Sequence, residues 1–257
     1  MHRWLAFPFP DAQYDYAGPA LREHWARLHA GDAVPFPENE AVQQAWRCFH
    51  AGEFEQAVRA GLAAGPAGLT VANKAQAVYA TYLEPNEKHK LALLLEVAER
   101  AQAQCAGQPD DAGAHFWLGY ALGRYAQGLN LLRAAEQGLG PRVREALEAT
   151  LRLAPAHADA RIALAALQAE LVDKTGPLLG KMQGASKASA VALFEAALQL
   201  NPTSVIGRIE YGIGLMMLEG EEALDAAERL YHDAAACRPA DATERLAVEA
   251  AISLLDV

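Results

Sequence analysis

Three side chains of different chemistry, Phe116, Tyr120 and Arg124, recur at every fourth position near the middle of the sequence. Residues four apart lie on one face of an α-helix, so these three would form a stripe. The stripe suits an extended peptide or an apolar acid, because arginine pairs with a carboxylate through two parallel hydrogen bonds. Two other interpretations stay open. The aromatic rings are equally suited to a core, and Arg124 could instead bridge to an acid such as Glu170 or Glu195.

Motifs that support catalysis or metal binding are missing from the sequence. Residues 176–182 (GPLLGKM) resemble a phosphate-binding loop, but the glycines are one residue too close and Met182 replaces the metal-binding hydroxyl. There is no H-E-x-x-H helix, no Cys/His pair at zinc spacing and no G-x-S-x-G elbow. His24 and His29 are five apart and would not share a helix face. We therefore predict no catalytic residue, no metal and no cofactor.

Composition and charge narrow the class of partner. The 257 residues are 52% hydrophobic but only 7% aromatic, as expected for closely packed helices, and the net charge of −10 argues against nucleic acid or an anionic membrane as partner. Cys48, Cys105 and Cys237 are odd in number and far apart, which indicates a reducing compartment, and we predict a cytoplasmic protein. No run of eighteen apolar residues exists and residues 1–10 lack a signal layout, so we predict no membrane insertion.

The elements around the stripe follow a repeated pattern. Pro109 precedes Asp110 and Asp111, which can cap a helix that begins near Ala112. A large residue beside a small one follows at Leu118-Gly119, where a second helix can approach closely. The same order recurs after two later prolines: Leu164-Ala165 follows Pro155, and Tyr211-Gly212 follows Pro202.

This pattern resembles the tetratricopeptide repeat, a helix–turn–helix unit of about 34 residues whose copies stack into a solenoid. The resemblance implies an all-α, right-handed helical-repeat solenoid, with an N-terminal extended segment and a C-terminal capping helix. We expect an entry segment at 1–37, holding a short helix at 19–30, and one repeat domain at 38–257. The expected repeats are about 38–70, 71–111, 112–157, 158–204 and 205–240, and the expected cap is 241–257.

A shorter sequence motif occurs once in the entry segment and again in the first repeat. The pattern Trp25-x3-His29-Ala-Gly31 returns as Trp46-x3-His50-Ala-Gly52. In each copy the glycine can take the left-handed conformation that ends a helix, and the acidic residue after it can cap the next element.

Two long insertions separate this chain from a regular repeat array. Pro109, Pro155, Pro202 and Pro239 are 46, 47 and 37 residues apart. We expect the surplus between the two helices of a repeat, as a prolonged first helix and turn over 128–140. The second insertion spans 172–186, and residues 173–186 are expected to be mobile or a lid and to hold the earliest protease cut inside the chain. Such irregular arrays are similar to the T component of TRAP-type transporters and to the regulators of microtubule dynamics. The transporter component is exported, whereas no signal layout is visible here.

In tetratricopeptide proteins the first helix of each repeat lines a concave groove, and the resemblance carries this role onto specific residues. The implied groove residues are Trp46, Phe49, His50, Phe116, Tyr120, Arg124, Ile209 and Ile213, while Met216 and Met217 favour the core. We predict a non-catalytic scaffold or adaptor that binds a peptide or protein. The alternative is a small-molecule carrier or transport accessory, whose insertions close the groove into an apolar cavity for a small apolar or carboxylate ligand.

Overall fold

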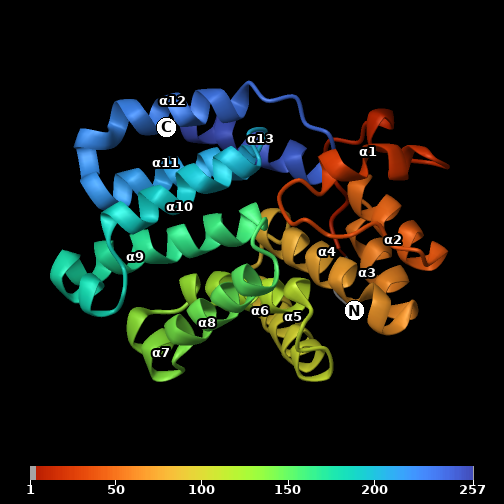
Figure 1. The fold of residues 1–257 in the computed structure, drawn as a ribbon. Coiled ribbons are helices and arrows are strands. Elements are labelled where there is room, and N and C mark those ends of the chain that lie inside the picture. The colour runs from red at the N-terminus through yellow and green to blue at the C-terminus, as the bar shows by residue number, and fades with distance from the viewer. Residues whose placement is uncertain (1–3, 257) are drawn as a thin grey trace. The chain divides into compact units, whose positions relative to one another are not determined.

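The computed structural model describes residues 4–256, apart from the side chain of Leu131. These residues form helices and connecting turns with no strand, which confirms the all-α helical-repeat prediction (Figure 1). The α-helices are α1 (Ala20–Leu28), α2 (Glu40–His50), α3 (Phe54–Ala63), α4 (Leu69–Tyr82), α5 (Glu87–Gly107), α6 (Ala112–Gln127), α7 (Leu131–Glu136), α8 (Leu139–Leu153), α9 (Ala158–Met182), α10 (Lys187–Leu200), α11 (Val205–Glu219), α12 (Leu224–Ala235) and α13 (Ala242–Leu255). Short 3-10 helices lie at Ala12–Tyr14, Gly65–Gly68 and Gly220–Ala223.

The chain divides into two compact units. Unit 1 consists of Met1–His29, Val34–Ala154 and Ala240–Thr243, and unit 2 of Ala30–Ala33, Pro155–Pro239 and Glu244–Val257. Unit 1 contains the helix pairs α2–α3, α4–α5 and α6–α8, and unit 2 contains α9–α10, α11–α12 and most of α13. The expected repeat limits, including the one at 71, stay predictions; α4 begins at Leu69. The single repeat domain itself stays a prediction.

Helix starts follow from capping residues placed directly before them. Asp111 accepts a hydrogen bond from the backbone N–H of Ala114 (3.1 Å), as its position after Pro109 predicts. Asn86 caps α5 in the same way, by accepting from the backbone N–H of His89. Each such oxygen takes up one of the four backbone donors that a helix start leaves without a partner inside the helix. The N-capping side chains of Asn86 and Asp111 therefore set where α5 and α6 begin.

Paired helices approach closely at glycines. A Cβ on Gly119 of α6 would lie 3.0 Å from Leu147 Cγ of α8. A Cβ on Gly212 of α11 would meet the ring of Tyr231 of α12, 2.9 Å from Cζ. At Gly212 real Cβ atoms essentially never come this near, and at Gly119 the approach is tighter than nine in ten real Cβ contacts. The sequence prediction of close packing at these glycines is confirmed.

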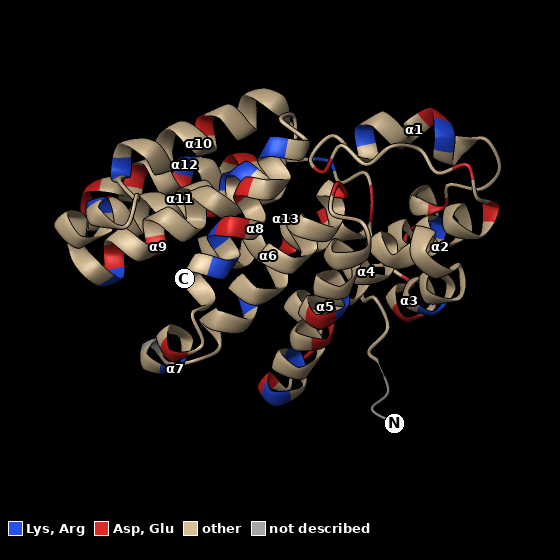
Figure 2. Ribbon diagram, turned by 60° about the horizontal axis from the view of Figure 1, so that its bottom comes forward, with Lys and Arg blue, Asp and Glu red and all other residues tan. Residues whose placement is uncertain are grey.

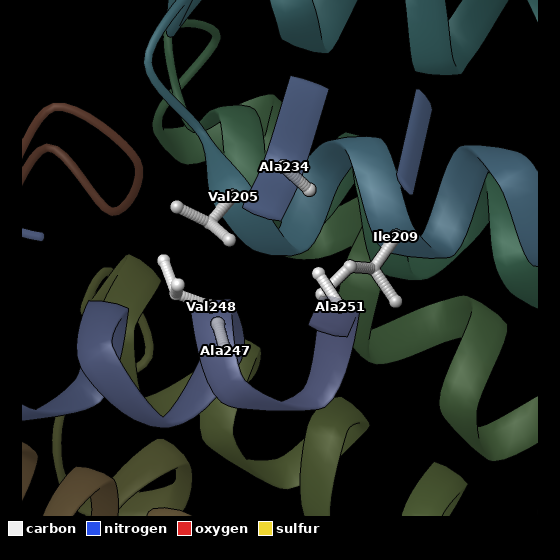
Figure 3. Packing of buried hydrophobic residues seen from close by; sticks show 6 residues of the cluster. All are labelled: Val205, Ile209, Ala234, Ala247, Val248 and Ala251. Atoms are coloured by element: carbon white, nitrogen blue, oxygen red, sulfur yellow. The ribbon is translucent and has the colours of Figure 1, made fainter. Parts of the chain in front are cut away.

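The core of unit 2 includes a cluster closed by α13. Val205 and Ile209 of α11 and Ala234 of α12 are buried against Ala247, Val248 and Ala251 of α13 (Figure 3). Burying apolar side chains here stabilises the unit by removing them from water. The last helix therefore covers the apolar face that α11 and α12 would otherwise expose, as a cap does.

Three local predictions were wrong. α6 is not prolonged: it ends at Gln127 and a separate short helix, α7, precedes α8. The helix α9 extends into the second insertion and ends at Met182. It does so across a kink at Gly176 (φ 79°, ψ 163°), after which Pro177 opens the continuation, where its missing N–H costs nothing. The mobility of residues 173–186 stays a prediction.

The other two wrong predictions concern the repeated Trp-x3-His-Ala-Gly pattern and the acidic residue after it. Gly52 has φ +83° as expected, but Gly31 is not in the left-handed region. Gly31 instead lies close to Asp159, whose carboxylate would have to move to make room for a Cβ at this position. Glu53 makes no side-chain cap to α3.

Replacing Gly119 by leucine should destabilise the protein. The new side chain has to displace Leu147, and overpacking of this kind costs about 1–3 kcal/mol. Urea unfolding monitored by circular dichroism measures the change. Gly140→Leu is the matched control, because no atom lies within 4 Å of a Cβ at this position. An unchanged midpoint for Gly119→Leu would contradict the close contact.

Candidate functional site

One face of α4 carries Lys74 and Thr81, which are seven residues apart and therefore lie on the same side of the helix. The Lys74 ammonium lies 5.1 Å from the ring centroid of Phe49 and 5.6 Å from that of Trp46. These are cation–π distances, at which the ring quadrupole attracts the charge. Both α4 side chains are half-buried, so this face of unit 1 is polar but partly shielded from water.

The same face of α4 continues onto α6. The hydroxyl oxygens of Thr81 and Tyr120 are 3.2 Å apart, and because Thr81 already donates to the carbonyl of Ala77, Tyr120 is the donor. The guanidinium of Arg124 lies 5.4 Å from the centroid of the Tyr120 ring. Its Nη1 donates to Gln127 Oε1 at 3.2 Å. Tyr120 and Arg124 are both half-buried and thus reachable from solvent.

Arg124 is the only Lys, Arg, Asp or Glu residue within α6. Figure 2 shows α6 mostly uncharged, whereas α1 and α5 carry charges of both signs. In a chain of net charge −10, a cation on an otherwise uncharged helix makes a local positive site. Lys74 and Arg124 thus mark the two ends of a face formed by α4 and α6, which we call the α4–α6 face and define by Lys74, Thr81, Tyr120 and Arg124.

The predicted stripe is divided between core and surface. Phe116 is buried and packs edge-on against Trp117, with ring centroids 4.8 Å apart. Tyr120 lies next to both rings but remains half-buried. Phe116 therefore lies in the core beneath the α4–α6 face, whereas Tyr120 and Arg124 are accessible on that face.

The first-repeat residues Trp46, Phe49 and His50 all lie in the core, with 2%, 0% and 0% exposure. His50 Nδ1 is 2.8 Å from a carboxylate oxygen of Asp241, 191 residues away. Such a pairing leaves no trace in sequence spacing. A groove role for the three α2 residues remains a prediction, since they are covered in this structure.

In unit 2 the two implied groove residues pack against α13. Ile209 is buried in the cluster of Figure 3, and Ile213 is partly buried against it. Met216 and Met217 are half-buried. The groove role implied for Ile209 and Ile213 also remains a prediction.

A polar network, which the sequence did not reveal, holds α4 against α5. Gln76 donates to the carbonyl of Leu93 (3.0 Å) and to Glu96 (2.9 Å), and it accepts from Arg100 (2.7 Å). Burial lowers the pKa of Arg100 from its ordinary value, with Glu96 opposing that effect. Because α4 turns this polar side toward α5, its Lys74–Thr81 side faces away from α5.

Neither a cluster of metal ligands nor a membrane-spanning helix is found among residues 4–256. No group of three His, Cys, Asp or Glu side chains there is arranged to hold a metal ion. No helix in that range is both long and apolar enough to cross a bilayer.

Neither the family models nor the curated proteins gave a match to this chain. Among solved structures, a thermophilic TPR protein of Thermus thermophilus matches 84% of this chain and 100% of its own, with a TM-score of 0.59 and 18% identity. The fold is a tetratricopeptide-like helical repeat. At this identity the likeness is one of fold alone.

Two further solved structures match with lower TM-scores. MamA matches 77% of this chain and 94% of its own at 16% identity and a TM-score of 0.42. YrrB, described as a TPR protein with an unusual peptide-binding site, matches 89% and 96% at 13% identity and a TM-score of 0.41. TM-scores below 0.5 do not establish a shared fold, so no conclusion is drawn from these two matches. The likeness to TRAP-transporter T components and microtubule-dynamics regulators is not confirmed by any of these matches.

Trp46 and Arg124 should respond in opposite ways to truncation. Trp46→Ala removes a buried ring and should lower the free energy of unfolding by about 3–5 kcal/mol. Arg124→Ala removes a half-buried cation and should change it by no more than about 0.5 kcal/mol. Chemical denaturation of both variants tests this. A stable Trp46→Ala protein would show that the ring is not part of the core.

Proposed function

We propose that the chain is a non-catalytic scaffold that holds an extended segment of a partner protein on the α4–α6 face. The observation that carries this is Arg124, a half-buried cation over the ring of Tyr120 on a helix with no other charge. A guanidinium supported in this way is less screened than one in open water, and it offers a planar fork to a carboxylate. The favoured ligand is therefore a peptide with a carboxylate at or near its end.

The rest of the face suits the remainder of such a peptide. Thr81 and Tyr120 present hydroxyl groups between the two cations, where the backbone of an extended peptide would need hydrogen-bond partners. Lys74 supplies a second positive charge above Phe49 and Trp46. Opposite charges steer association and fix the register of the ligand, so an acidic peptide is favoured over a basic one.

No feature of residues 4–256 specifically favours the alternative function, a small-molecule carrier, and we do not propose it.

The cytoplasmic location also remains a prediction, which rests on the three widely spaced cysteines. Burial, with the nearby Asp111, raises the pKa of the Cys105 thiol to about 11, so this cysteine stays a neutral thiol near neutral pH.

The test uses a random octapeptide library with free carboxyl termini. Peptides selected on the wild-type chain should lose about 2 kcal/mol or more of binding free energy to Arg124→Ala, because a buried carboxylate is left without its partner. Amidation of the peptide terminus should weaken binding to the wild type by a similar amount, but should have little further effect on Arg124→Ala. Fluorescence anisotropy measures each affinity.

The matched control is Arg133→Ala, which removes an exposed arginine from α7 in the same unit and should bind like the wild type. Two outcomes contradict the proposal. The first is a library that yields no binder. The second is an Arg124→Ala protein that loses stability but not affinity, which would make Arg124 a structural brace.

A further inference from the structure

Side chains of α1 contact the α2 side chains to which the tetratricopeptide pattern gives a groove role. The ring of Trp25 is perpendicular to those of Trp46 (5.6 Å between centroids, 90°) and His50 (6.4 Å, 88°). His29, directly after α1, is likewise perpendicular to Trp46 (4.6 Å, 89°) and His50 (5.4 Å, 81°). The first-repeat face is therefore occupied by the protein's own chain.

The four rings form two stacked pairs that cross at right angles. Trp25 stacks on His29 at 3.8 Å and 25°, and Trp46 stacks on His50 at 5.8 Å and 22°. Edge-to-face contacts between such pairs are favourable because the positive ring edge meets the negative face. Both pairs come from the same sequence pattern, Trp-x3-His-Ala-Gly. The α2 face formed by Trp46 and His50 thus binds a segment that carries an aromatic ring and, four residues later, an imidazole.

Hydrogen bonds at the edges of this cluster hold it in register. The indole N–H of Trp25 donates to the carbonyl of Val34 at 2.7 Å. The hydroxyl of Tyr16 donates to the carbonyl of Ala240 at 2.6 Å, and the neighbouring Asp241 contacts His50. The cluster also borders the α4–α6 face, because Lys74 lies over the ring of Trp46. A ligand on one face would therefore be close to the other.

We propose that α1 is an internal ligand of the first repeat. It occupies the face formed by Trp46 and His50, and a partner helix with an aromatic residue and a histidine four residues later competes with it for that face. This inference rests on the proposed scaffold function and extends it, since α1 then controls access to the face formed by Trp46 and His50.

The physical basis is the short length of α1. A nine-residue helix is marginal in water, so α1 owes its order to its contacts with α2 and with Val34 and Phe36. When a binding face is open only part of the time, the measured affinity falls by the open fraction. Weakening the hold of α1 should therefore strengthen the binding of a competing helix.

The test uses the full chain and a fluorescein-labelled synthetic peptide of residues 19–32, the sequence of α1 itself. The wild type should bind the peptide weakly, and Trp25→Ala should bind it about tenfold tighter or more, because its own α1 occupies the face for less time. A peptide with alanine at its tryptophan should not bind either protein. Trp4→Ala is the matched control, since Trp4 stacks on Tyr79 outside the cluster (3.9 Å), and it should bind like the wild type.

The proposal is overturned if Trp25→Ala remains helical and melts cooperatively but binds the peptide no tighter than the wild type. If that variant does not fold, hydrogen exchange of the wild type decides. Amides of α1 should then exchange about tenfold faster than those of α2, and equal protection would make α1 a fixed part of the repeat. Arg124→Ala should leave binding of the 19–32 peptide unchanged, so a failure of this proposal is distinguishable from a failure at the α4–α6 face.

Discussion

Close contact between paired helices is the constraint on which both units depend. Gly119 lets α6 approach Leu147 of α8, and Gly212 lets α11 approach the ring of Tyr231. Interiors packed at this density have no room for an added methyl group, so the helix pairs have little freedom to slide or rotate. When one side of a helix is fixed against its partner, the rotation of the helix is fixed, and with it the direction of the side chains on the opposite side. The positions of the candidate site residues follow from that rigidity.

The rotation of α4 illustrates this. Asn73 donates to Gln104 (3.2 Å) and Gln76 donates to Leu93 (3.0 Å), so the amide side of α4 is tied to α5. Buried amides are costly unless they find partners, and these bonds therefore fix the rotation of α4. Lys74 and Thr81 are left to face α2 and α6, where they contact Trp46 and Tyr120. A buried network without a catalytic role thus positions the proposed binding face.

The aromatic cluster shows a different use of repetition. Trp25 and His29 copy the pattern of Trp46 and His50, and the two copies pack against each other. Repeat proteins need terminal elements that cover their last apolar face. Here α1 does this with a motif that matches the face it covers. A cap of this kind is chemically close to a ligand, which is why α1 is a natural competitor for a partner helix.

The sequence by itself determined the helical class, the helix start at Asp111 and the close approach at Gly119, because capping, proline breaks and small residues act within one or two turns. It also placed Tyr120 and Arg124 on one face, since helical spacing alone does so. Only the tertiary structure decided that Trp46 and His50 are covered. Their cover comes from α1 and from Asp241, which is 191 residues from His50. Whether a side chain lines a groove or a core depends on which distant segment packs over it, and local spacing carries no record of that.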